Sequence, residues 1–521
     1  MAEYGNNTIK PVFPPLYLYE PDMTEKRINL KENNINKLNI IKSSMNKRKI
    51  LFIAALLLSA LAVNAAGKIY KPWSNGRLVV SENNRYIVHE NGQPFFWMGN
   101  TAWLLPERLN REEAEYFLEK DRLAGYNVEQ IQVLNAIPTF NVYGHAANNA
   151  EFDFSKVSKP GVYGYWEHLD YIVDVAASNG IYIAMDCIWG SMIDKMDVKK
   201  AATLGKFLGE RYKDKPNIIW MIGGDIMGDK KPEVWDAMAR AIKKADKNHI
   251  MTFHPRGRTT SAWWYNDREW MDFNMFQSGH RRYGQRNGDG DYTIKENTEE
   301  DNWRYVDMSF EKKPLRPVID GEPSYEDIPQ GLHDFSAPRW MDYDVRRYAY
   351  WAVFGGAFGH TYGHNSVMQF IRPGLKASFG AEKPWWEAME DPGYNQMKYL
   401  KWLMLSFPFT ERVADQSIVV GQNGERYDRV IATRGNDYML VYNYSGKPMG
   451  IDLTKISGAK KNVWWMNPAD GKLTYLGEYD SKVTEFTYDA AYLRGSDRVL
   501  IAVDSSKNYI GKTDTQIQEK Q

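Results

Sequence analysis

The sequence has a single cysteine and no excess of charge of either sign. Cys187 is the only cysteine in 521 residues, so an intramolecular disulfide and a structural zinc site built from several thiolates are excluded. Lysine plus arginine and aspartate plus glutamate number 66 each. The basic balance that nucleic-acid binding usually needs is therefore absent, and we expect no nucleic-acid partner. Cys187 lies in an apolar segment, which favours a buried thiol.

Several cofactor and catalytic motifs are also missing. The chain has no G-x-G-x-x-G after an early strand, no G-x-S-x-G nucleophile elbow and no H-E-x-x-H helix. These absences disfavour a dinucleotide-binding sheet, a serine esterase and a zinc peptidase. His360 and His364 have i, i+4 spacing, but Tyr362-Gly363 between them fits a strand or loop. We expect no cofactor and no metal at the catalytic site, and leave a calcium site in the C-terminal region open.

A secretory signal peptide is indicated near the N-terminus. From Met45, three basic residues at 47–49 precede an apolar run over 50–63, and Val63-Asn64-Ala65 resembles a cleavage site. The run is shorter than the ~20 residues of a membrane span. We therefore expect residues 1–44 to be a non-native extension and 45–65 to be the signal peptide. The mature protein is expected in the periplasm or outside the cell, with no membrane span.

Strand and helix patterns alternate over residues 66–405. An alternating stretch at 77–92 predicts a β-hairpin. Apolar runs then predict strands at 95–99, 128–134, 181–187, 218–222, 250–254, 273–277, 317–320 and 356–360. Helices are predicted at 111–124, 165–178, 198–212, 232–246, 299–306, 343–354 and 394–405. Repeated units of this kind give parallel strands, and eight of them close into a (β/α)₈ TIM barrel of the α/β class.

The pattern changes after about residue 406. Short alternating strands are predicted at 417–420, 429–433, 438–444, 462–466 and 499–503, with turns such as Gly435-Asn436 and Asp470-Gly471 between them. This spacing predicts a small all-β antiparallel sandwich over 406–506 and a polar tail over 507–521. Its apolar face at 438–444 and the V-W-W at 463–465 could dock on the barrel, so we expect the sandwich to brace it; sugar binding by the sandwich is the alternative.

Two predicted strands end in acids. The fourth strand, I-I-W-M-I-G-G-D, ends at Asp225, and the seventh, P-V-I-D-G-E-P, carries Asp320 and Glu322. Reactive groups stand at the carboxyl ends of barrel strands, and strands four and seven lie across the mouth from each other. Two facing carboxyl groups are what glycoside hydrolysis requires. Apolar neighbours such as Trp220 should raise the pKa of Asp225, which suits a general acid/base. Pro323 favours an extended backbone at Glu322, which suits an ionised nucleophile.

Other polar and aromatic residues near the strand ends could bind sugar hydroxyls or stack on a sugar ring. The candidates are Asn100, Trp103, Gln132, Asn135, Trp189, His254, Arg256, Gln277, His280, His360 and Tyr362, together with Trp263, Trp264 and His364. Arginines on the loops after strands five and six could bind the carboxylates of uronic acids; these are Arg256, Arg258, Arg281 and Arg282. For each of these residues, a packing or surface role is the alternative.

Two of these segments also resemble a known family. W-M-I-G-G-D-I-M-G and P-V-I-D-G-E-P-S-Y-E-D are similar to glycoside hydrolase family 140, the apiosidase-type enzymes, as is the opening G-R-L-V-V-S-E-N-N-R-Y. The C-terminal N-V-W-W-M-N-P-A-D-G-K-L resembles the β-sandwich that follows this barrel in the family. The resemblance covers nearly the whole chain after the signal peptide.

The resemblance implies a retaining β-glycosidase that acts on an apiose-linked side chain of the pectin rhamnogalacturonan II. It places the acid/base at Asp225 and the nucleophile at Glu322. Many related barrel glycosidases have Asn-Glu at the end of the fourth strand, where this chain has Gly224-Asp225. Aspartate is one methylene shorter, so the substrate must sit deeper or the loop must advance.

Two other functions remain alternatives. Aromatic residues make up 14% of the chain, which also fits a non-catalytic carbohydrate- or matrix-binding protein. Such a protein would keep its ligand affinity after Asp225→Ala or Glu322→Ala. An esterase or lyase on pectic material is the third reading, weakened by the missing serine elbow. In each case we expect a polysaccharide or oligosaccharide partner and a monomer.

Overall fold

The computed structural model describes residues 69–157, 161–285, 300–488, 495–512 and 515–519. The predicted extension and signal peptide therefore lie outside the described residues. Within the described ranges, no helix combines the length and the apolar character needed to span a membrane.

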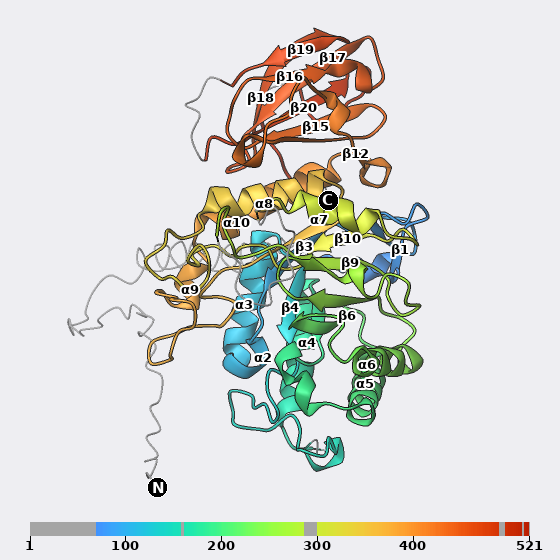
Figure 1. Ribbon diagram of the computed structural model, residues 1–521, viewed down its shortest axis with the longest axis vertical. Helices are drawn as coiled ribbons and strands as arrows, with labels where there is room; N and C mark the ends of the chain where they lie inside the picture. The colour runs from blue at the N-terminus through green and yellow to red at the C-terminus, as the bar shows by residue number, and fades with distance from the viewer. Residues whose placement is uncertain (1–68, 158–160, 286–299, 489–494, 513–514, 520–521) are drawn as a thin grey trace, which may run out of the picture. The chain divides into compact units, whose positions relative to one another are not determined.

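Eight parallel strands form the barrel (Figure 1). They are β3 (Trp97–Thr101), β4 (Val128–Gln132), β5 (Tyr182–Asp186), β6 (Ile218–Ile226), β7 (Met251–Pro255), β9 (Asn274–Gln277), β10 (Val318–Asp320) and β11 (Gly359–Tyr362). Parallel pairing runs from β3 to β7 and from β9 through β11 back to β3. Between β7 and β9, the Asp272 N–H donates to Met251 O at 2.9 Å. The predicted TIM barrel is confirmed.

Helices follow seven of the eight strands. They are α2 (Leu105–Arg108), α3 (Arg111–Ala124), α4 (Tyr165–Asn179), α5 (Val198–Tyr212), α6 (Pro232–Ala245), α7 (Trp303–Phe310), α8 (Asp342–Phe354), α9 (Trp385–Ala388) and α10 (Pro392–Leu405). The fifth strand is the exception to the predicted eight units. After β7 the chain forms a two-residue strand, β8 (Thr259–Thr260), and a 3₁₀ turn, η4 (Ser261–Trp263), instead of a helix. The tryptophan-rich sequence of this connection is irregular, as its pattern indicated.

Local capping explains where the helices begin and end, as α3 illustrates. The Asn110 side chain accepts the Glu113 N–H at 2.9 Å, and the Glu113 carboxylate accepts the Asn110 N–H at 3.0 Å. This capping box satisfies two amide groups that the first helical turn leaves free. Gly125 ends the helix in the left-handed conformation, at φ 96°.

The predicted hairpin is present and lies at the amino-terminal end of the barrel. Strand β1 (Leu78–Val80) pairs antiparallel with β2 (Ile87–His89). Just before β1, Arg77 Nη1 donates to Asn248 Oδ1 at 3.2 Å, and Asn248 belongs to the turn that precedes β7. The hairpin therefore lies at the end of the barrel opposite the carboxyl ends of the strands, where chemistry is expected.

The C-terminal region is an antiparallel sandwich, as predicted. The larger sheet contains β12 (Val413–Ala414), β14 (Val430–Arg434), β15 (Tyr438–Asn443), β20 (Arg498–Asp504), β17 (Lys460–Met466), β18 (Lys472–Asp480) and β21 (Thr515–Gln516). The smaller sheet contains β13 (Val419–Val420), β16 (Met449–Asp452) and β19 (Val483–Phe486). We call these sheets together the β-domain.

Side chains of β15 alternate between two cores, as the period of a strand requires. Met439 and Val441 belong to the core between the two sheets. Tyr438, Leu440 and Tyr442 belong to the core that continues into the barrel. This face of β15 packs against the barrel as expected. Of the V-W-W at 463–465, Trp464 belongs to the same core, whereas Val463 and Trp465 belong to the core between the two sheets.

Stacked rings and an ion pair join the β-domain to α8. Tyr442 stacks on Tyr350 with ring centroids 4.7 Å apart. Arg346 of α8 binds Asp497 through two hydrogen bonds, at 2.8 and 2.9 Å, and both side chains are buried. These contacts fit the predicted bracing role.

Candidate active site

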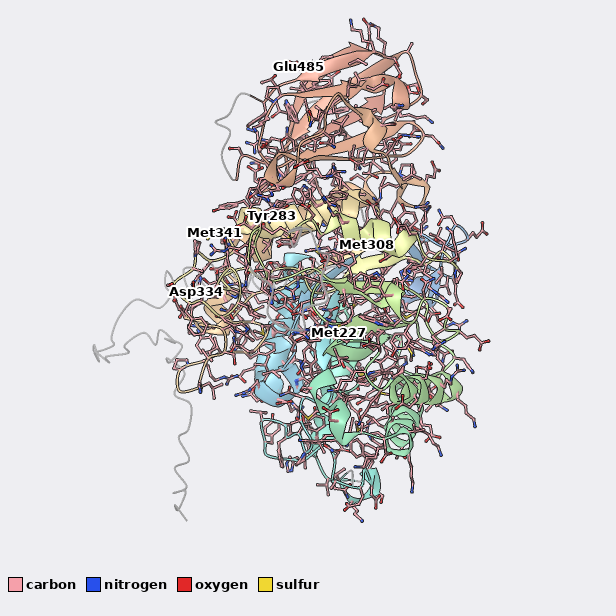
Figure 2. The ribbon with its side chains drawn as sticks, viewed as in Figure 1. Met227, Tyr283, Met308, Asp334, Met341 and Glu485 are labelled. Carbon is pink, nitrogen blue, oxygen red and sulfur yellow. The ribbon has the colours of Figure 1, made fainter. Side chains whose placement is uncertain are left out.

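Strand β6 delivers Asp225 to the opening of the barrel through a bend that only glycine permits. Gly223, Gly224 and Asp225 all have positive φ, at 114°, 86° and 50°. A Cβ on Gly224 would lie 2.6 Å from the Trp189 ring and 2.8 Å from Asp186 Oδ2. The glycine pair therefore lets the backbone turn over a crowded floor, and the Asp225 side chain reaches solvent. Met227, two residues later, marks this end of β6 in Figure 2.

Glu322 lies two residues beyond β10 and is 7% exposed. His280 Nε2 donates to Glu322 Oε1 at 3.1 Å. On the other side, His254 Nε2 lies 3.2 Å from Glu322 Oε2. The carboxylate is therefore held between two imidazole rings.

The His254 ring connects the two predicted acids. Its Nδ1 accepts the backbone N–H of Asp225 at 3.3 Å, which leaves Nε2 to carry the ring proton toward Glu322. A second backbone donor, Gly257 N–H, lies 3.4 Å from Asp225 Oδ1. The backbone N–H of Asp225 and the carboxylate of Glu322, from strands four and seven of the barrel, thus both contact the His254 ring.

The two acids have opposite ionisation tendencies. Burial by the surrounding protein and then the negative charge of Glu322 raise the pKa of Asp225 to about 6. Burial also opposes ionisation of Glu322, but the contacts of His254 and His280 outweigh it and lower its pKa to about 2. The Asp225 side chain keeps one side open to solvent. Its pKa is therefore raised by partial burial and by the charge of Glu322, and the carboxyl group is not completely removed from water.

The direction of the Asp225 pKa shift and its largest cause, burial, match the sequence prediction, but Trp220 is not the neighbour that buries the carboxyl group. The Trp220 indole points away from the opening and donates to Asp246 Oδ2 at 2.8 Å, behind the strand. The negative charge of Glu322 adds to the rise in pKa, and His254 opposes it; both residues come from other strands.

Aromatic side chains line the floor beside the acids. Trp103 lies 5.2 Å from Trp189 and 5.3 Å from His254, measured between ring centroids. Its Nε1 donates to the Tyr325 hydroxyl at 3.2 Å, and Tyr325 packs edge-on against His280 at 4.5 Å. Trp103, Trp189, His254 and His280 were predicted for the site. Tyr325 was not, although it stands three residues after Glu322 in the same motif.

Sequence reasoning also missed Asp186, at the end of β5. It is fully buried, and neither carboxylate oxygen has a hydrogen-bond partner among the described residues. Burial raises its pKa to about 8. The signal was available, because A-M-D ends the third strand as G-G-D ends the fourth. In the described part of the chain, no group of three or more His, Cys, Asp or Glu is arranged to hold a metal ion.

Two predicted glutamines lie beneath the same opening. Gln132 ends β4 beside Asp186 in the parallel register, and Gln277 ends β9. Both are 4% exposed, and each has an amide oxygen without a partner among the described residues. With Asp186 they offer acceptors that donors such as sugar hydroxyls would satisfy.

Several predicted residues point behind the strands, and for these the structure corrects the prediction. Asn100 is buried and donates to Asp121 of α3 at 2.9 Å. Tyr362 donates to Glu326, which the first turn of α10 also binds. His360, two residues before Tyr362, shares its face of β11 and is fully buried. Asp320 accepts from Asn302 at 3.0 Å and does not share the cleft with Glu322.

The remaining candidates lie around the rim or outside it. Arg256 is exposed, and its charge slightly opposes the raised pKa of Asp225. His364 is buried and pairs with Asp391 at 2.8 Å, away from both acids. The others lie on the loops that follow the strands: Asn135, Trp263, Trp264, Arg281 and Arg282 are partly or fully exposed, and Arg258 is buried.

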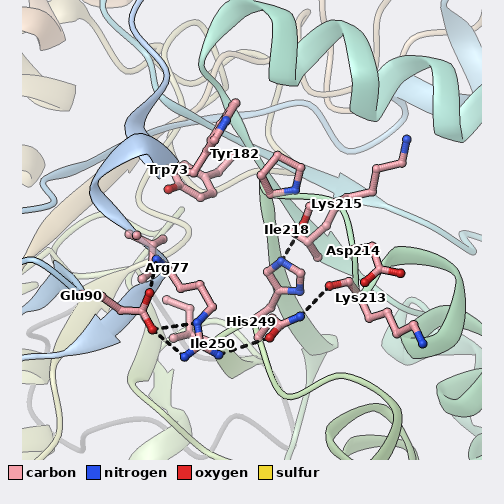
Figure 3. Close-up of a pocket in the computed structure, with 14 residues that line it drawn as sticks. Trp73, Arg77, Glu90, Tyr182, Lys213, Asp214, Lys215, Ile218, His249 and Ile250 are labelled. Atoms are coloured by element: carbon pink, nitrogen blue, oxygen red, sulfur yellow. Dashed lines mark hydrogen bonds and ion pairs between the residues drawn. The ribbon is translucent and has the colours of Figure 1, made fainter.

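A separate hollow of about 420 Å³ lies at the opposite end of the barrel (Figure 3). Its lining includes Trp73, Arg77, Tyr182 and His249, from the N-terminal segment and the turns that precede the strands. None of the acids described above borders it. The chemistry therefore concentrates at the carboxyl ends of the strands, as in other TIM barrels.

Residues 81–411 match the family model for the apiosidase-like catalytic domain. The chain belongs to the apiosidase-like family. Residues 413–503 match a second family, named for collagen binding in a collagenase. No curated protein matches the chain.

Solved structures of glycoside hydrolases are also similar to this chain. The chain is 66% identical to a glycoside hydrolase family 5 structure from Bacteroides vulgatus, with a TM-score of 0.86 over 87% of this chain and 99% of that one. It is 64% identical to a second glycoside hydrolase, with a TM-score of 0.84 over 85% of this chain and 100% of that one. A more distant glycoside hydrolase from Bacteroides vulgatus, at 14% identity and a TM-score of 0.55, shares the fold. This apiosidase-like chain is a glycoside hydrolase.

Proposed function

We propose that this enzyme is a retaining β-glycosidase that releases apiose from side chains of rhamnogalacturonan II, as the resemblance to family 140 implies. Asp225 is the general acid/base and Glu322 is the nucleophile. One observation carries the proposal: Glu322 contacts the His254 ring through its carboxylate and Asp225 contacts it through its backbone N–H, and the pKa values of the two carboxyl groups are displaced in opposite directions, to about 2 and about 6. Such a split assigns the acid and base roles in known glycosidases.

The reaction would take two steps. The Glu322 carboxylate attacks the anomeric carbon while Asp225 transfers its proton to the departing oxygen, which leaves as an alcohol. Asp225, now ionised, removes a proton from a water molecule that attacks the same carbon. The bond to Glu322 breaks, and the sugar leaves with its original anomeric configuration.

Substrate recognition would come from the floor and rim of the cleft. Trp189 is partly exposed beside Asp225 and can stack on a sugar ring. Gln132 and Gln277 would accept hydroxyl protons, and Arg256 would bind an acidic sugar next to the cleaved bond. We also propose that the enzyme is exported and monomeric.

Incubation with rhamnogalacturonan II oligosaccharides tests the proposal directly. We expect free apiose from the wild type and none from Glu322→Gln. Proton NMR in the first minutes should show the β-anomer first, since a retaining enzyme requires it; the α-anomer would show an inverting one. Release of unsaturated products that absorb ultraviolet light would show a lyase instead. Binding without release by the wild type, unchanged in both acid variants, would favour a non-catalytic carbohydrate-binding protein.

A further inference from the structure

A short segment of the β-domain reaches the loop that carries His280. The segment is the 3₁₀ turn η7 (Arg426–Asp428), just before β14. The Tyr427 hydroxyl lies 3.0 Å from both carboxylate oxygens of Glu300. Glu300 lies before α7 in the β9–α7 connection, so this contact joins the β-domain to a loop on the cleft side of the barrel.

The Glu300 carboxylate is buried and fixed from a second side. Arg347 of α8 donates to Glu300 Oε2 at 2.7 Å, and both side chains are fully buried. The rings of Tyr348, Trp351, Tyr427 and Tyr444 surround the guanidinium at 4.6 to 5.4 Å. A buried ion pair needs such complete coordination to be held in one geometry.

The other Glu300 oxygen fixes the backbone close to the active site. Glu300 Oε1 accepts the N–H of Tyr283 at 2.8 Å. The Tyr283 ring also packs against Tyr427 at 5.3 Å, and Arg426 lies 5.1 Å above it. Figure 2 shows Tyr283 on the side of the barrel toward the β-domain.

Tyr283 is three residues from His280, whose ring donates to Glu322. The backbone at His280 itself is also held by hydrogen bonds. Gly279 N–H donates to Glu322 O, and Gly331 N–H donates to His280 O, both at 3.0 Å. His280 is therefore held between the Glu322 backbone on one side and the Tyr283–Glu300–Tyr427 contacts on the other.

We propose that Tyr427 of the β-domain is a positioning residue for Glu322. Its hydroxyl keeps Glu300 in reach of the Tyr283 N–H, and this holds the His280 ring against the nucleophile. Without the hydroxyl, the Glu300 carboxylate is held only by Arg347 and the Tyr283 N–H, and the loop loses one anchor. The kinetic part of this inference rests on the proposed function, but the geometric part does not.

Tyr427→Phe removes one oxygen and keeps the ring that packs on Arg347 and Tyr283. We expect kcat to fall about tenfold with KM within about twofold, since small misplacements near the reacting atoms cost rate. The acidic limb of the kcat profile should move to higher pH, because Glu322 loses part of a donor that favours its ionised form. Tyr438→Phe is the matched control. Its hydroxyl donates to Pro408 O at 2.9 Å, at the same domain interface, and no hydrogen bond joins it to the described residues of the His280 loop.

The imidazole ¹⁵N resonances of His280, assigned by their loss in His280→Asn, give a readout that needs no substrate. They should move in Tyr427→Phe and stay in place in Tyr438→Phe. Unchanged His280 resonances would overturn the inference, whether or not the wild type hydrolyses pectic glycans. Equal losses of kcat and melting temperature in both variants would also overturn it, since they would show only weaker domain docking. A wild type without hydrolytic activity, with the His280 shift present, would reject the proposed function and leave the positioning role supported.

Discussion

Two regions of this molecule hold buried carboxyl groups whose bonding partners differ. At the junction with the β-domain, Asp497 accepts from Arg346 through both oxygens and from the Tyr442 hydroxyl at 3.0 Å. In the cleft, Glu322 contacts imidazoles, and Asp186 has no partner among the described residues. Arginine stays charged at every working pH, whereas imidazole does not.

This contrast separates structural from chemical acids. A carboxylate paired with arginine and fully hydrogen-bonded has one stable state, so it fixes geometry. A carboxyl group beside imidazoles and other acids has a proton that can move within the working pH range. The comparison predicts that loss of Asp225 or Glu322 in the cleft alters rate, whereas loss of the Arg346 partner of Asp497 at the junction alters stability.

The largest expected effect is that of Glu322→Gln. Removing the attacking oxygen should lower kcat on the order of 10⁴-fold or more, as losses of catalytic nucleophiles do. The melting temperature should also fall, because the amide has one oxygen to accept from the two imidazoles that favour the carboxylate, so the rate is measured on the folded protein. Release of sugar at fixed enzyme concentration measures the effect. Wild-type rates in a folded Glu322→Gln protein would place the nucleophile elsewhere.

Asp225→Asn should be nearly as damaging on the natural substrate, by about 10²- to 10⁴-fold, because the departing alcohol needs a proton. In the wild type, the acid is lost as pH rises through the Asp225 pKa of about 6, so kcat/KM should fall above that pH. An aryl glycoside whose leaving group needs no proton should restore the first step in the variant. The variant should then show no alkaline limb, and persistence of that limb would assign it to another group.

Arg346→Met tests the structural role of the buried Arg346–Asp497 pair at the junction with the β-domain. It leaves the buried Asp497 without its cation and should lower the free energy of unfolding by about 3–5 kcal/mol. The rate of the folded enzyme should stay within about twofold of the wild type. Urea denaturation and assays well below the transition measure the two effects. Lys460→Met, which removes the exposed ion pair with Asp480, is the control and should change neither.

Asp186→Asn should have an effect that depends on pH and is seen when stability is compared across pH. The pKa of Asp186 is about 8 in the folded protein, above the ~3.9 of an unfolded chain. The folded state therefore holds this proton more tightly, and the stability it contributes is lost as pH rises toward 8. We expect the variant to melt higher than the wild type at pH 8, with a smaller difference at pH 5. Parallel melting curves at both values would mean that Asp186 ionises normally.

The order of strands and the position of both acids follow from sequence alone. Apolar runs such as 218–222 end at glycine or proline and mark the strands. The hydrophobic periodicity and the length of the segments between them identify the helices. Asp225 and Glu322 stand out because each follows a buried strand closely, where an ionised side chain is costly unless it has a function. The family motifs around them gave the same two residues.

The direction of side chains could not be predicted in the same way. Barrel strands are buried on both faces, so their sequences show no polar side that would mark the interior. Asn100 and Tyr362 therefore looked equivalent to Gln132 and Gln277, although they point toward the helices. The His254 bridge and the Tyr427 contact join residues distant in the chain, and no local pattern encodes them.

The most direct measurement is an NMR titration of ¹³C-labelled carboxyl groups, assigned through Asp225→Asn and Glu322→Gln. It needs no substrate and reports the proton on each acid. The coupled pair should titrate with apparent pKa values of about 6 for Asp225 and about 2 for Glu322. Titration of both groups near the ordinary ~4 of free carboxyls would contradict the assignment of acid and nucleophile.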